Sequence, residues 1–399
     1  MKIGIEAQRI FRKKKHGMDM VALELIKNLQ IIDKENEYFI FVKPDEDNTA
    51  LQETSNFRII EVNGGPYASW EQIALPKAAK NYGCDVLHCT SNTAPFFTDI
   101  PLITILHDII YMESSYFKIL TSSASNYQKF GNVYRKLVVP RVVKNSEKVI
   151  TVSHFEKKRI SDFFGLKDDH KLNAIYNGVS EHFKPVTNKQ EIKRVKEKYN
   201  LPAKYFFFLG NTDPKKNTKG VLKAFSDYLK QTDSNHKLVM LDYDTIELNK
   251  LLIEINDTKL IDQILLTGYV INTDLPAIYS QCDVFLYPSL RESFGIPMLE
   301  AMSCNIPVIT SNTSSMPEVS CGAAHIVNPF NSEEITQGLI EIMTNEAYRK
   351  SLCSKGLKRS EQFTWMKMAN DYLKLYKLIH SERSENNKLL QNNDICKVN

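Results

Sequence analysis

The sequence has no long apolar segment. Nowhere in its 399 residues do about eighteen uncharged apolar residues run together, which is the minimum that indicates a membrane-spanning helix. The chain enters the pattern of a strand at 2–7, with no apolar stretch of the kind that a secretory signal carries. We therefore expect a cytoplasmic protein, either soluble or attached peripherally to the inner face of the membrane.

Cysteine pairs and a strong net charge are missing too. The seven cysteines stand at irregular spacings without a Cys-x-x-Cys pair, which argues against a disulfide framework and a zinc site and favours reduced thiols. The formal net charge is +4 with 25% charged residues, so the chain as a whole does not look built to bind nucleic acid.

Short apolar runs alternate with amphipathic segments along the whole chain. This alternation is typical of parallel sheets covered by helices, and the length fits two domains, so we predict an α/β fold with two doubly wound domains. A helical pattern spans 18–30, and the predicted strands lie near 2–7, 38–42, 85–88, 102–106, 148–152, 205–210, 237–241, 263–269, 283–287, 306–310 and 324–327.

The domain boundaries follow from composition. A polar stretch with Pro185 suggests a hinge at 183–190, which gives a first domain of 1–184 and a second of 185–364. Apolar residues keep helical spacing from Trp365 to Ile379, so we expect a last helix over 365–383. From Ser384 the chain is rich in asparagine, and we expect a disordered tail over 384–399.

Two glutamates, Glu292 and Glu300, flank the junction between a predicted strand and a helix. The strand near 283–287 leads into a loop with Glu292, and Pro297 stands where a helix tolerates proline, one turn before Glu300. The free N–H groups and positive end of that helix suit an anion, and the two carboxylates can accept hydrogen bonds from vicinal hydroxyls. The alternative is a capped helix with two solvated acids, and spacing alone does not decide between them.

The same stretch carries a family resemblance. From Glu292 through Pro297 and Glu300 to Glu318-Val319, the sequence resembles the Glu-Gly-Phe-Gly-Leu-Pro signature region of family 4 glycosyltransferases, retaining enzymes of the GT-B fold. The resemblance implies two Rossmann-like domains that face each other across a cleft, with the last helix crossing back to the first domain. It also implies that Glu292 contacts hydroxyls of the donor sugar and that Glu300 holds the ribose of the nucleotide.

Further donor-binding positions follow from the resemblance. Beside Glu292 they are Ser293, which replaces the usual glycine, and Phe294, Gly295 and Ile296. The motif departs from the family pattern again at Asn305, which replaces another glycine ahead of the Pro-Val strand.

A lysine pair, Lys215 and Lys216, follows the predicted strand at 205–210. Junctions of this kind bind phosphate in α/β folds, although a lysine pair taken alone is more often a solvated basic turn. The family has a similar Pro-Arg-Lys-Asn, which implies that Lys216, with Lys215 second, neutralises the diphosphate. Asn211 stands where many relatives have an arginine, and Val270 falls in a loop that reads the base.

The first domain offers His107 and Gly17. His107 ends the strand at 102–106, where a lone histidine is more often structural, but the resemblance implies a contact with donor sugar or acceptor. The first strand-to-helix loop has only Gly17, with several basic residues, where relatives wrap donor and acceptor more closely.

The resemblance implies a retaining transfer from a GDP- or UDP-sugar to a glycan or lipid-linked acceptor. Trp70-Glu71-Gln72 resembles a subgroup acting on polysaccharide or O-antigen precursors, often mannosyltransferases. We expect no cofactor and no metal, because no Asp-x-Asp lies in a suitable loop and the lysines with a helix dipole can offset the leaving charge. The catalytic candidates are His107, Lys216 and Glu292. Two alternatives remain: a nucleotide-sugar epimerase of similar architecture, and a catalytically silent binding homologue.

The segment 118–159 holds ten basic residues against two acidic ones. Phe130, Val133, Tyr134 and Leu137 recur there at helical spacing, so a basic amphipathic helix would suit an anionic membrane surface. The alternative is a solvated helix that packs its apolar face on the first domain.

Overall fold

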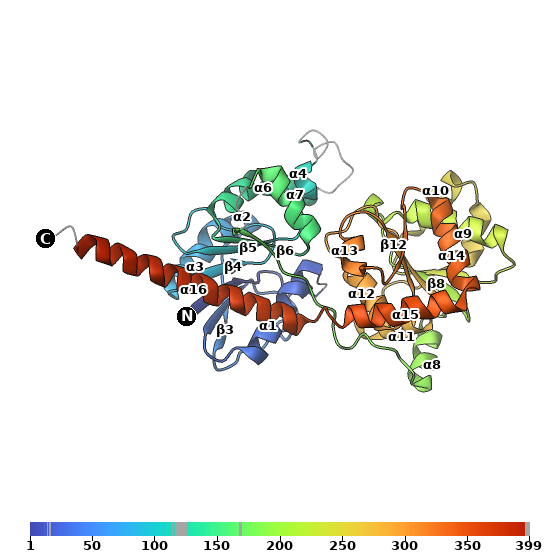
Figure 1. Ribbon diagram of the computed structural model, residues 1–399, viewed down its shortest axis with the longest axis horizontal. Coiled ribbons are helices and arrows are strands. Elements are labelled where there is room, and N and C mark those ends of the chain that lie inside the picture. The colour runs from blue at the N-terminus through green and yellow to red at the C-terminus, as the bar shows by residue number, and fades with distance from the viewer. Residues whose placement is uncertain (14, 16, 114, 116–125, 167–169, 396–399) are drawn as a thin grey trace. The chain divides into compact units, whose positions relative to one another are not determined.

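The computed structural model describes the chain except residues 14, 16, 114, 116–125, 167–169 and 396–399. The chain forms two compact units: unit 1 contains Met1–Tyr176 together with Trp365–Asn399, and unit 2 is Asn177–Thr364 (Figure 1). The sequence placed the first boundary at 184/185, eight residues after the division between the units. No helix in the described part of the chain is both long enough and apolar enough to cross a membrane.

Unit 1 is built on a parallel sheet. Its described strands have the order β3-β2-β1-β4-β5-β6-β7, so the direction of winding reverses between β1 and β4. The short edge strands β3 and β7 had not been predicted. Only the first residue of β3 is buried and β7 has three residues, so neither gives a continuous apolar run. The strands are β1 (Lys2–Glu6), β2 (Glu37–Val42), β3 (Phe57–Glu61), β4 (Val86–Cys89), β5 (Leu102–Leu106), β6 (Lys148–Thr151) and β7 (Leu172–Ala174).

Helices cover this sheet, and the last of them comes from the end of the chain. Helix α16 lies against α1, and Tyr376 on α16 bonds through its hydroxyl to Nδ1 of the buried His88, at 2.7 Å (Figure 1). The predicted return of the last helix to the first domain is therefore confirmed. The described helices of unit 1 are α1 (Gly17–Ile32), α2 (Tyr67–Ser69), η1 (Trp70–Ala74), α3 (Leu75–Asn81), α4 (Ile110–Glu113), α6 (Asn126–Asn145), α7 (His154–Phe164) and α16 (Trp365–Ile395).

The end of α16 differs from the expected tail. The helix continues to Ile395, whereas the sequence placed a disordered segment from Ser384. Asparagine lowers helix propensity by only a fraction of a kcal/mol, so an Asn-rich composition does not by itself stop a helix already formed. The end of the expected tail, 396–399, lies outside the described residues.

Unit 2 repeats the layout. The order of its described parallel strands is β10-β9-β8-β11-β12-β13, and the winding reverses between β8 and β11. Residues of β8 and β11 are fully buried, as strands covered on both faces must be. The strands are β8 (Tyr205–Phe208), β9 (Lys237–Met240), β10 (Ile264–Leu266), β11 (Val284–Tyr287), β12 (Val308–Ser311) and β13 (His325–Val327).

The core of unit 2 packs helices onto this sheet. Phe206 on β8 meets Phe225 on α9 edge to face, at 6.1 Å between ring centroids, and Leu339 on α14 joins the same buried cluster. The described helices are α8 (Lys189–Lys198), η2 (Pro214–Lys216), α9 (Thr218–Gln231), α10 (Thr245–Glu254), η3 (Thr258–Gln263), η4 (Asn272–Asp274), α11 (Leu275–Gln281), α12 (Ile296–Ser303), α13 (Met316–Ser320), α14 (Ser332–Thr344) and α15 (Glu346–Ser360).

Candidate active site

In unit 2, the loops that follow β8 and β11 meet at the point where the winding reverses. Neighbouring parallel strands diverge there into helices on opposite faces, and such switch points are where open α/β sheets bind ligands. The amide of Leu290 donates to the carbonyl of Lys215 at 2.7 Å. The Asn217 side-chain amide donates to the Pro288 carbonyl at 3.1 Å, and Asn217 itself has a left-handed backbone, φ 61°. These bonds fix one loop against the other.

This junction brings Lys216 and Glu292 together. Lys216 Nζ lies 2.6 Å from Glu292 Oε1, and both side chains are mostly buried, 16% and 12% exposed. The ammonium group also lies over the ring of Tyr287, at 5.2 Å from its centroid. Because both charges are largely removed from water, losing either partner would leave the other poorly solvated. The sequence had named both residues but had not named Tyr287.

Two serines that the sequence analysis missed hold the backbone of Glu292. Its amide donates to Ser314 Oγ at 3.0 Å, and Ser315 Oγ donates to its carbonyl at 3.1 Å. Ser314 has a positive φ of 52°, a conformation that a serine rarely adopts. A pair of adjacent serines carries no chemical signal in a sequence, so only the fold reveals this contact.

Gly295 is the N-cap of helix α12. Its φ is 98°, a conformation that glycine adopts readily and other residues do not, and a Cβ added there would lie 2.4 Å from Met316 Cε, so that the methionine side chain would have to shift. Ser293 and Phe294 precede it and Ile296 is the first helical residue, so the predicted donor positions form this turn. The ring of Phe294 is buried and contacts Phe363, at 5.7 Å between centroids. Pro297 in the first turn of α12 has no N–H, and the amide of Met298 donates to the carbonyl of Gly295 at 3.1 Å, so the positive end of the helix dipole is what favours an anionic group there.

Glu300 lies on α12, five residues beyond Gly295, and its carboxylate is half-buried. Oε2 accepts a hydrogen bond from the hydroxyl of Tyr279 at 3.0 Å, on α11. Burial raises the pKa of Glu300 to about 7. Near neutral pH the group therefore exists in both protonation states, and a ligand that donates hydrogen bonds to it would favour the ionised one.

The remaining predicted residues of unit 2 lie further from the ion pair. Lys215 is partly exposed and pairs with Asp213 at 3.4 Å. Asn211 is exposed, and its Oδ1 accepts the amide of Asp213 at 2.9 Å. Val270 lies in the loop after the edge strand β10, and Gly268 in the same loop has φ 68°. Within the described part of the chain, no side-chain hydrogen bond or ion pair joins any of these three residues to Glu292 or Glu300.

His107 and Gly17 belong to unit 1. The backbone amide of His107 donates to Asn92 Oδ1 at 2.6 Å, and its Nε2 lies 3.0 Å from the carbonyl of Thr90. A carbonyl only accepts, so Nε2 carries the proton and Nδ1 is the acceptor. Burial lowers the pKa of His107, which keeps the ring neutral at pH 7. Gly17 is the first residue of α1, with open space where a Cβ would stand.

Near the carboxyl ends of β4 and β5, Glu71 anchors the loop that carries Asn92. It belongs to the π-helical turn η1, and its buried carboxylate accepts hydrogen bonds from the hydroxyls of Tyr67, Thr93 and Tyr134, the last at 2.6 Å. Burial raises the pKa of Glu71. The motif at 70–72 therefore ties the loop after β4 to η1 and α6.

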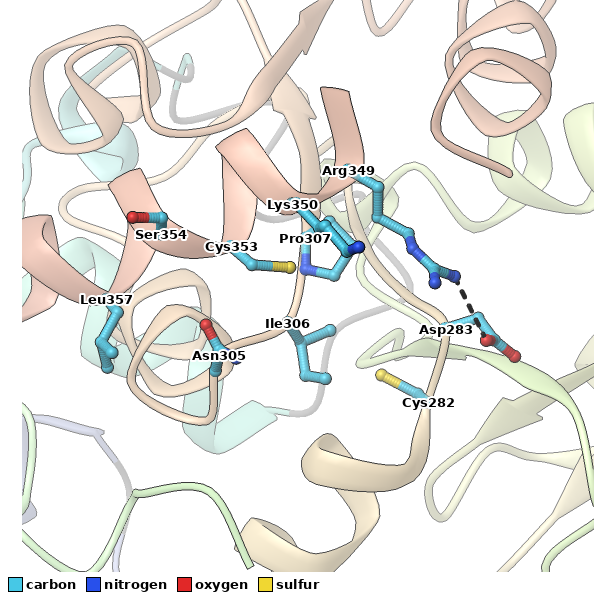
Figure 2. Close-up of a pocket in the computed structure, with 10 residues that line it drawn as sticks. All are labelled: Cys282, Asp283, Asn305, Ile306, Pro307, Arg349, Lys350, Cys353, Ser354 and Leu357. Atoms are coloured by element: carbon cyan, nitrogen blue, oxygen red, sulfur yellow. Dashed lines mark ion pairs between the residues drawn. The ribbon is translucent and has the colours of Figure 1, made fainter. Parts of the chain in front are cut away.

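A hollow of about 510 Å³ opens elsewhere on unit 2 (Figure 2). Asp283 and Asn305 in its wall stand at the amino ends of β11 and β12, and Arg349 of α15 pairs with Asp283 at 3.9 Å. Parallel α/β sheets bind their ligands beyond the carboxyl ends instead, and no predicted site residue lines this hollow. Its lining consists of Cys282, Asp283, Asn305, Ile306, Pro307, Arg349, Lys350, Cys353, Ser354 and Leu357.

Comparison with known proteins identifies the family. Residues 16–183 match the family model described as Glycosyltransferase Family 4, and residues 189–359 match the one described as Glycosyl transferases group 1. The chain belongs to glycosyltransferase family 4. The resemblance inferred from the stretch around Glu292 is thereby confirmed.

Several curated relatives of this chain are named as bacterial mannosyltransferases. O-antigen chain mannosyltransferase B of Escherichia coli is 29% identical over 58% of this chain and 60% of its own length. Serotype-specific mannosyltransferase WbdA of Escherichia coli is 27% identical over 56% of this chain and 28% of its own. O-antigen chain mannosyltransferase RfbU of Salmonella typhimurium is 32% identical over 49% of this chain and 51% of its own length. The matches thus span less than two thirds of each of these relatives.

Solved structures show the same fold. Alr3699/HepE of Anabaena, in complex with UDP and glucose, has a TM-score of 0.69 and 16% identity, covering 94% of this chain and 99% of its own. A glycosyltransferase from Rickettsia africae has a TM-score of 0.70 and 20% identity, covering 95% and 98%. Together with the two parallel sheets, these likenesses confirm that the chain has the GT-B fold.

Proposed function

We propose that this chain transfers a sugar from a nucleotide diphosphate sugar to a glycan or lipid-linked saccharide, with retention of configuration, in the synthesis of a cell-surface polysaccharide. The observation that carries the proposal is the Lys216–Glu292 pair at the switch point of unit 2, in loops beside α12, which carries Glu300 in its first turns. The relatives named as O-antigen mannosyltransferases make a mannosyl donor the first to test. A cytoplasmic location belongs to the same proposal.

The proposed donor site uses each group according to its chemistry. Glu300 would accept hydrogen bonds from the ribose hydroxyls, and the loop at Val270 would meet the base. The diphosphate would lie at the turn of Ser293, Gly295 and Ile296, where the positive end of the α12 dipole favours an anion. Asn211 and Lys215 would stand at the outer side of the diphosphate. Alr3699/HepE has been solved with UDP and with UDP-glucose, which supports this donor class.

Charge balance explains why Lys216 and Glu292 would act together. When the glycosidic bond to the β-phosphate breaks, negative charge grows on the leaving oxygen, and the Lys216 ammonium would offset it. Glu292 would then hydrogen-bond to hydroxyls of the sugar. In this scheme the acceptor hydroxyl attacks from the face that the diphosphate leaves, and its proton passes to the leaving phosphate oxygen. His107, neutral at pH 7, would contact the donor sugar or the acceptor, and no metal takes part.

A product assay tests the proposal. The chain would be incubated with GDP-mannose and a panel of other nucleotide sugars, with and without saccharide acceptors that include lipid-linked ones. We expect nucleoside diphosphate and an elongated saccharide to form together, with the anomeric configuration of the donor retained in the NMR spectrum of the product. Conversion of the donor to another nucleotide sugar without any acceptor would identify an epimerase. Nucleotide binding without turnover across the panel would identify a silent binding homologue.

A further inference from the structure

Unit 1 exposes large apolar side chains around the outward side of α6. Ile73 on η1, Phe97 in the loop after β4, and Phe130 and Leu137 on α6 are 67%, 81%, 60% and 55% exposed. Phe130 and Leu137 are seven residues apart and share one face of the helix. We call these four residues the apolar patch.

Contacts among their neighbours connect the segments that carry the patch. The Phe130 ring lies 6.4 Å from the ring of Tyr134, whose hydroxyl accepts from Gln72 Nε2 at 2.9 Å. Gln72 directly precedes Ile73, and its Oε1 accepts the amide of Phe96 at 3.1 Å. Phe96 in turn precedes the fourth member of the patch. A large aromatic side chain has ~200 Å² of surface, so the four side chains together expose a few hundred Å² of apolar surface.

Basic side chains surround the patch. Lys77 and Lys80 are exposed on α3, next to Ile73 in sequence, and Lys144 is exposed two turns beyond Leu137. Arg141 is also exposed, and its guanidinium lies over the Phe96 ring at 5.5 Å. Within the described chain, none of the four forms an ion pair with a carboxylate. We call them the basic rim; the exposed acid in the same loop as Phe97 is Asp99.

The basic rim shares only Arg141 and Lys144 with the basic segment at 118–159. Residues 118–125 lie outside the described part of the chain, and several other charges of the segment are engaged within unit 1. Lys136 Nζ donates to the carbonyl of Met112 at 2.8 Å, and Lys148 pairs with Glu382 at 3.4 Å. Arg159 forms an ion pair with Glu113. Net charge along a segment therefore does not locate the surface that faces outward.

We propose that the apolar patch and the basic rim form a docking surface for an anionic lipid bilayer. Phe97, Phe130 and the two aliphatic side chains would enter the interfacial layer, where amphipathic helices bury their apolar faces. The four cations of the rim would meet the phosphate groups of anionic lipids. Charge complementarity favours an anionic lipid surface as the occupant, because the four cations of the rim are exposed and none of them forms an ion pair within the described residues. The proposal goes beyond sugar transfer and does not depend on it.

Vesicle sedimentation tests the proposal. The native chain should sediment with phosphatidylglycerol vesicles at low salt and remain in the supernatant with phosphatidylcholine vesicles. Replacing Lys77, Lys80, Arg141 and Lys144 by glutamine should weaken the partition onto phosphatidylglycerol at least about tenfold. The double variant Phe97→Ser and Phe130→Ser should weaken it by a similar factor at a salt concentration that screens exposed charges.

Matched controls remove the same charge and the same apolar area elsewhere. Replacing Lys184, Lys189, Lys196 and Lys358 of unit 2 by glutamine removes four exposed charges, and Phe330→Ser with Ile246→Ser removes two exposed apolar side chains. Both controls should sediment like the native chain. Circular dichroism melting curves identify any variant that fails to fold, and a single Phe97→Ser variant then replaces it.

Three outcomes would overturn the proposal. The first is native chain that stays in the supernatant with phosphatidylglycerol at low salt, and the second is an equal loss of binding in the control variants. The third is a dimer in analytical ultracentrifugation that the patch variants abolish, because the patch would then bind a second copy of the chain. Nucleotide binding is measured separately on the same samples, so a failure of the docking proposal can be distinguished from a failure of the proposed function.

Discussion

At the scale of single residues, the site depends on charged side chains that lie close together and are partly buried from water. Lys216 and Glu292 neutralise each other at 2.6 Å, and Glu300 keeps a raised pKa beside Tyr279. A bound donor would replace water around both groups, so each residue makes a prediction of its own.

We expect Lys216→Ala to lower the turnover number by about a hundredfold or more and donor affinity by less than about tenfold. The reason is that charge on the leaving diphosphate grows toward the transition state, where the ammonium interacts most strongly. Steady-state kinetics with calorimetric donor binding measure the two effects. The matched control is Lys215→Ala, whose side chain is more exposed and should matter less. A larger effect at Lys215, or equal losses of turnover and affinity in Lys216→Ala, would show that the contact is misplaced.

Glu300 should make nucleotide binding depend on pH. Its pKa is about 7 in the unliganded chain, and ribose hydroxyls donate to the ionised form, so affinity for a nucleoside diphosphate should rise as pH increases through 7 and level off above it. Glu300→Gln should bind about tenfold more weakly than the native chain at pH 8 and almost equally at pH 6. Calorimetry at both values measures this, and the residual pH dependence of the variant reports the titration of the ligand itself.

The raised pKa of Glu300 should make the stability of the folded chain decrease with pH, whereas nucleotide affinity should increase. A carboxyl group whose folded pKa lies above its unfolded value of 4.5 contributes stability below pH 4.5 and loses it as pH rises through about 7. Glu300→Gln should therefore resist urea better than the native chain at pH 8, by about 1–3 kcal/mol. If the variant bound nucleotide like the native chain at both pH values, Glu300 would not hold the ribose.

At the scale of elements, the site is made by turns rather than by helices or strands. Strands β8 and β11 bring two loops side by side, and each loop contains a residue that requires a left-handed backbone, Asn217 and Gly295. The loop after β12 adds Ser314, also with a positive φ, which binds the Glu292 amide. The sheet supplies the frame, and these three turns decide where the charged groups point.

Gly295→Ala tests the turn before α12. A methyl group there would lie 2.4 Å from Met316 Cε in a backbone conformation with φ 98°, so we expect a loss of about 1–3 kcal/mol in unfolding free energy and at least tenfold weaker donor binding. Urea unfolding and calorimetry measure the two effects. Gly322→Ala is a matched control, because Gly322 also has a positive φ but has open space around it. Equal binding losses in both variants would mean that the turn at Gly295 is not part of the donor site.

At the scale of the whole molecule, the chain consists of two units of the same architecture, and each holds some of the residues named in the proposed function. Each sheet reverses its winding once, at β1 and β4 in unit 1 and at β8 and β11 in unit 2. The residues assigned to the nucleotide lie in unit 2 except for Gly17, whereas His107 and the surface around α6 lie in unit 1. Ligands that bind one unit should therefore stabilise that unit first.

A thermal shift screen of nucleotides tests this division. A nucleoside diphosphate of the correct base, at about a hundredfold excess over its Kd, adds ~2.7 kcal/mol to the stability of the state that binds it and should raise Tm by roughly 5–10 °C. If the two units melt in separate steps, only one step should move. Nucleoside monophosphates should shift it less, because they lack the second phosphate. A screen in which no nucleotide diphosphate or nucleotide sugar changes Tm would reject unit 2 as a donor site.

The sequence by itself determined the fold class, most of the strands and the family. Continuous apolar runs such as 205–208 and 284–287 predict buried parallel strands because both faces of such strands are covered, and the stretch from Glu292 to Val319 carries the resemblance. Edge strand β3 and the continuation of α16 to Ile395 were missed, because short edges and polar helix ends leave weak patterns.

Only the tertiary structure decided which groups meet. Lys216 and Glu292 are 76 residues apart, and their contact exists because β8 and β11 are neighbours in the sheet. Tyr279, Tyr287, Ser314 and Ser315 surround the two glutamates, yet nothing in their local sequence marks them as parts of a site. The sequence specifies which residues are charged and how apolar residues are spaced, and these features determine local structure. Distances and burial, which set the pKa of Glu300 and expose the patch around α6, arise when distant segments pack together.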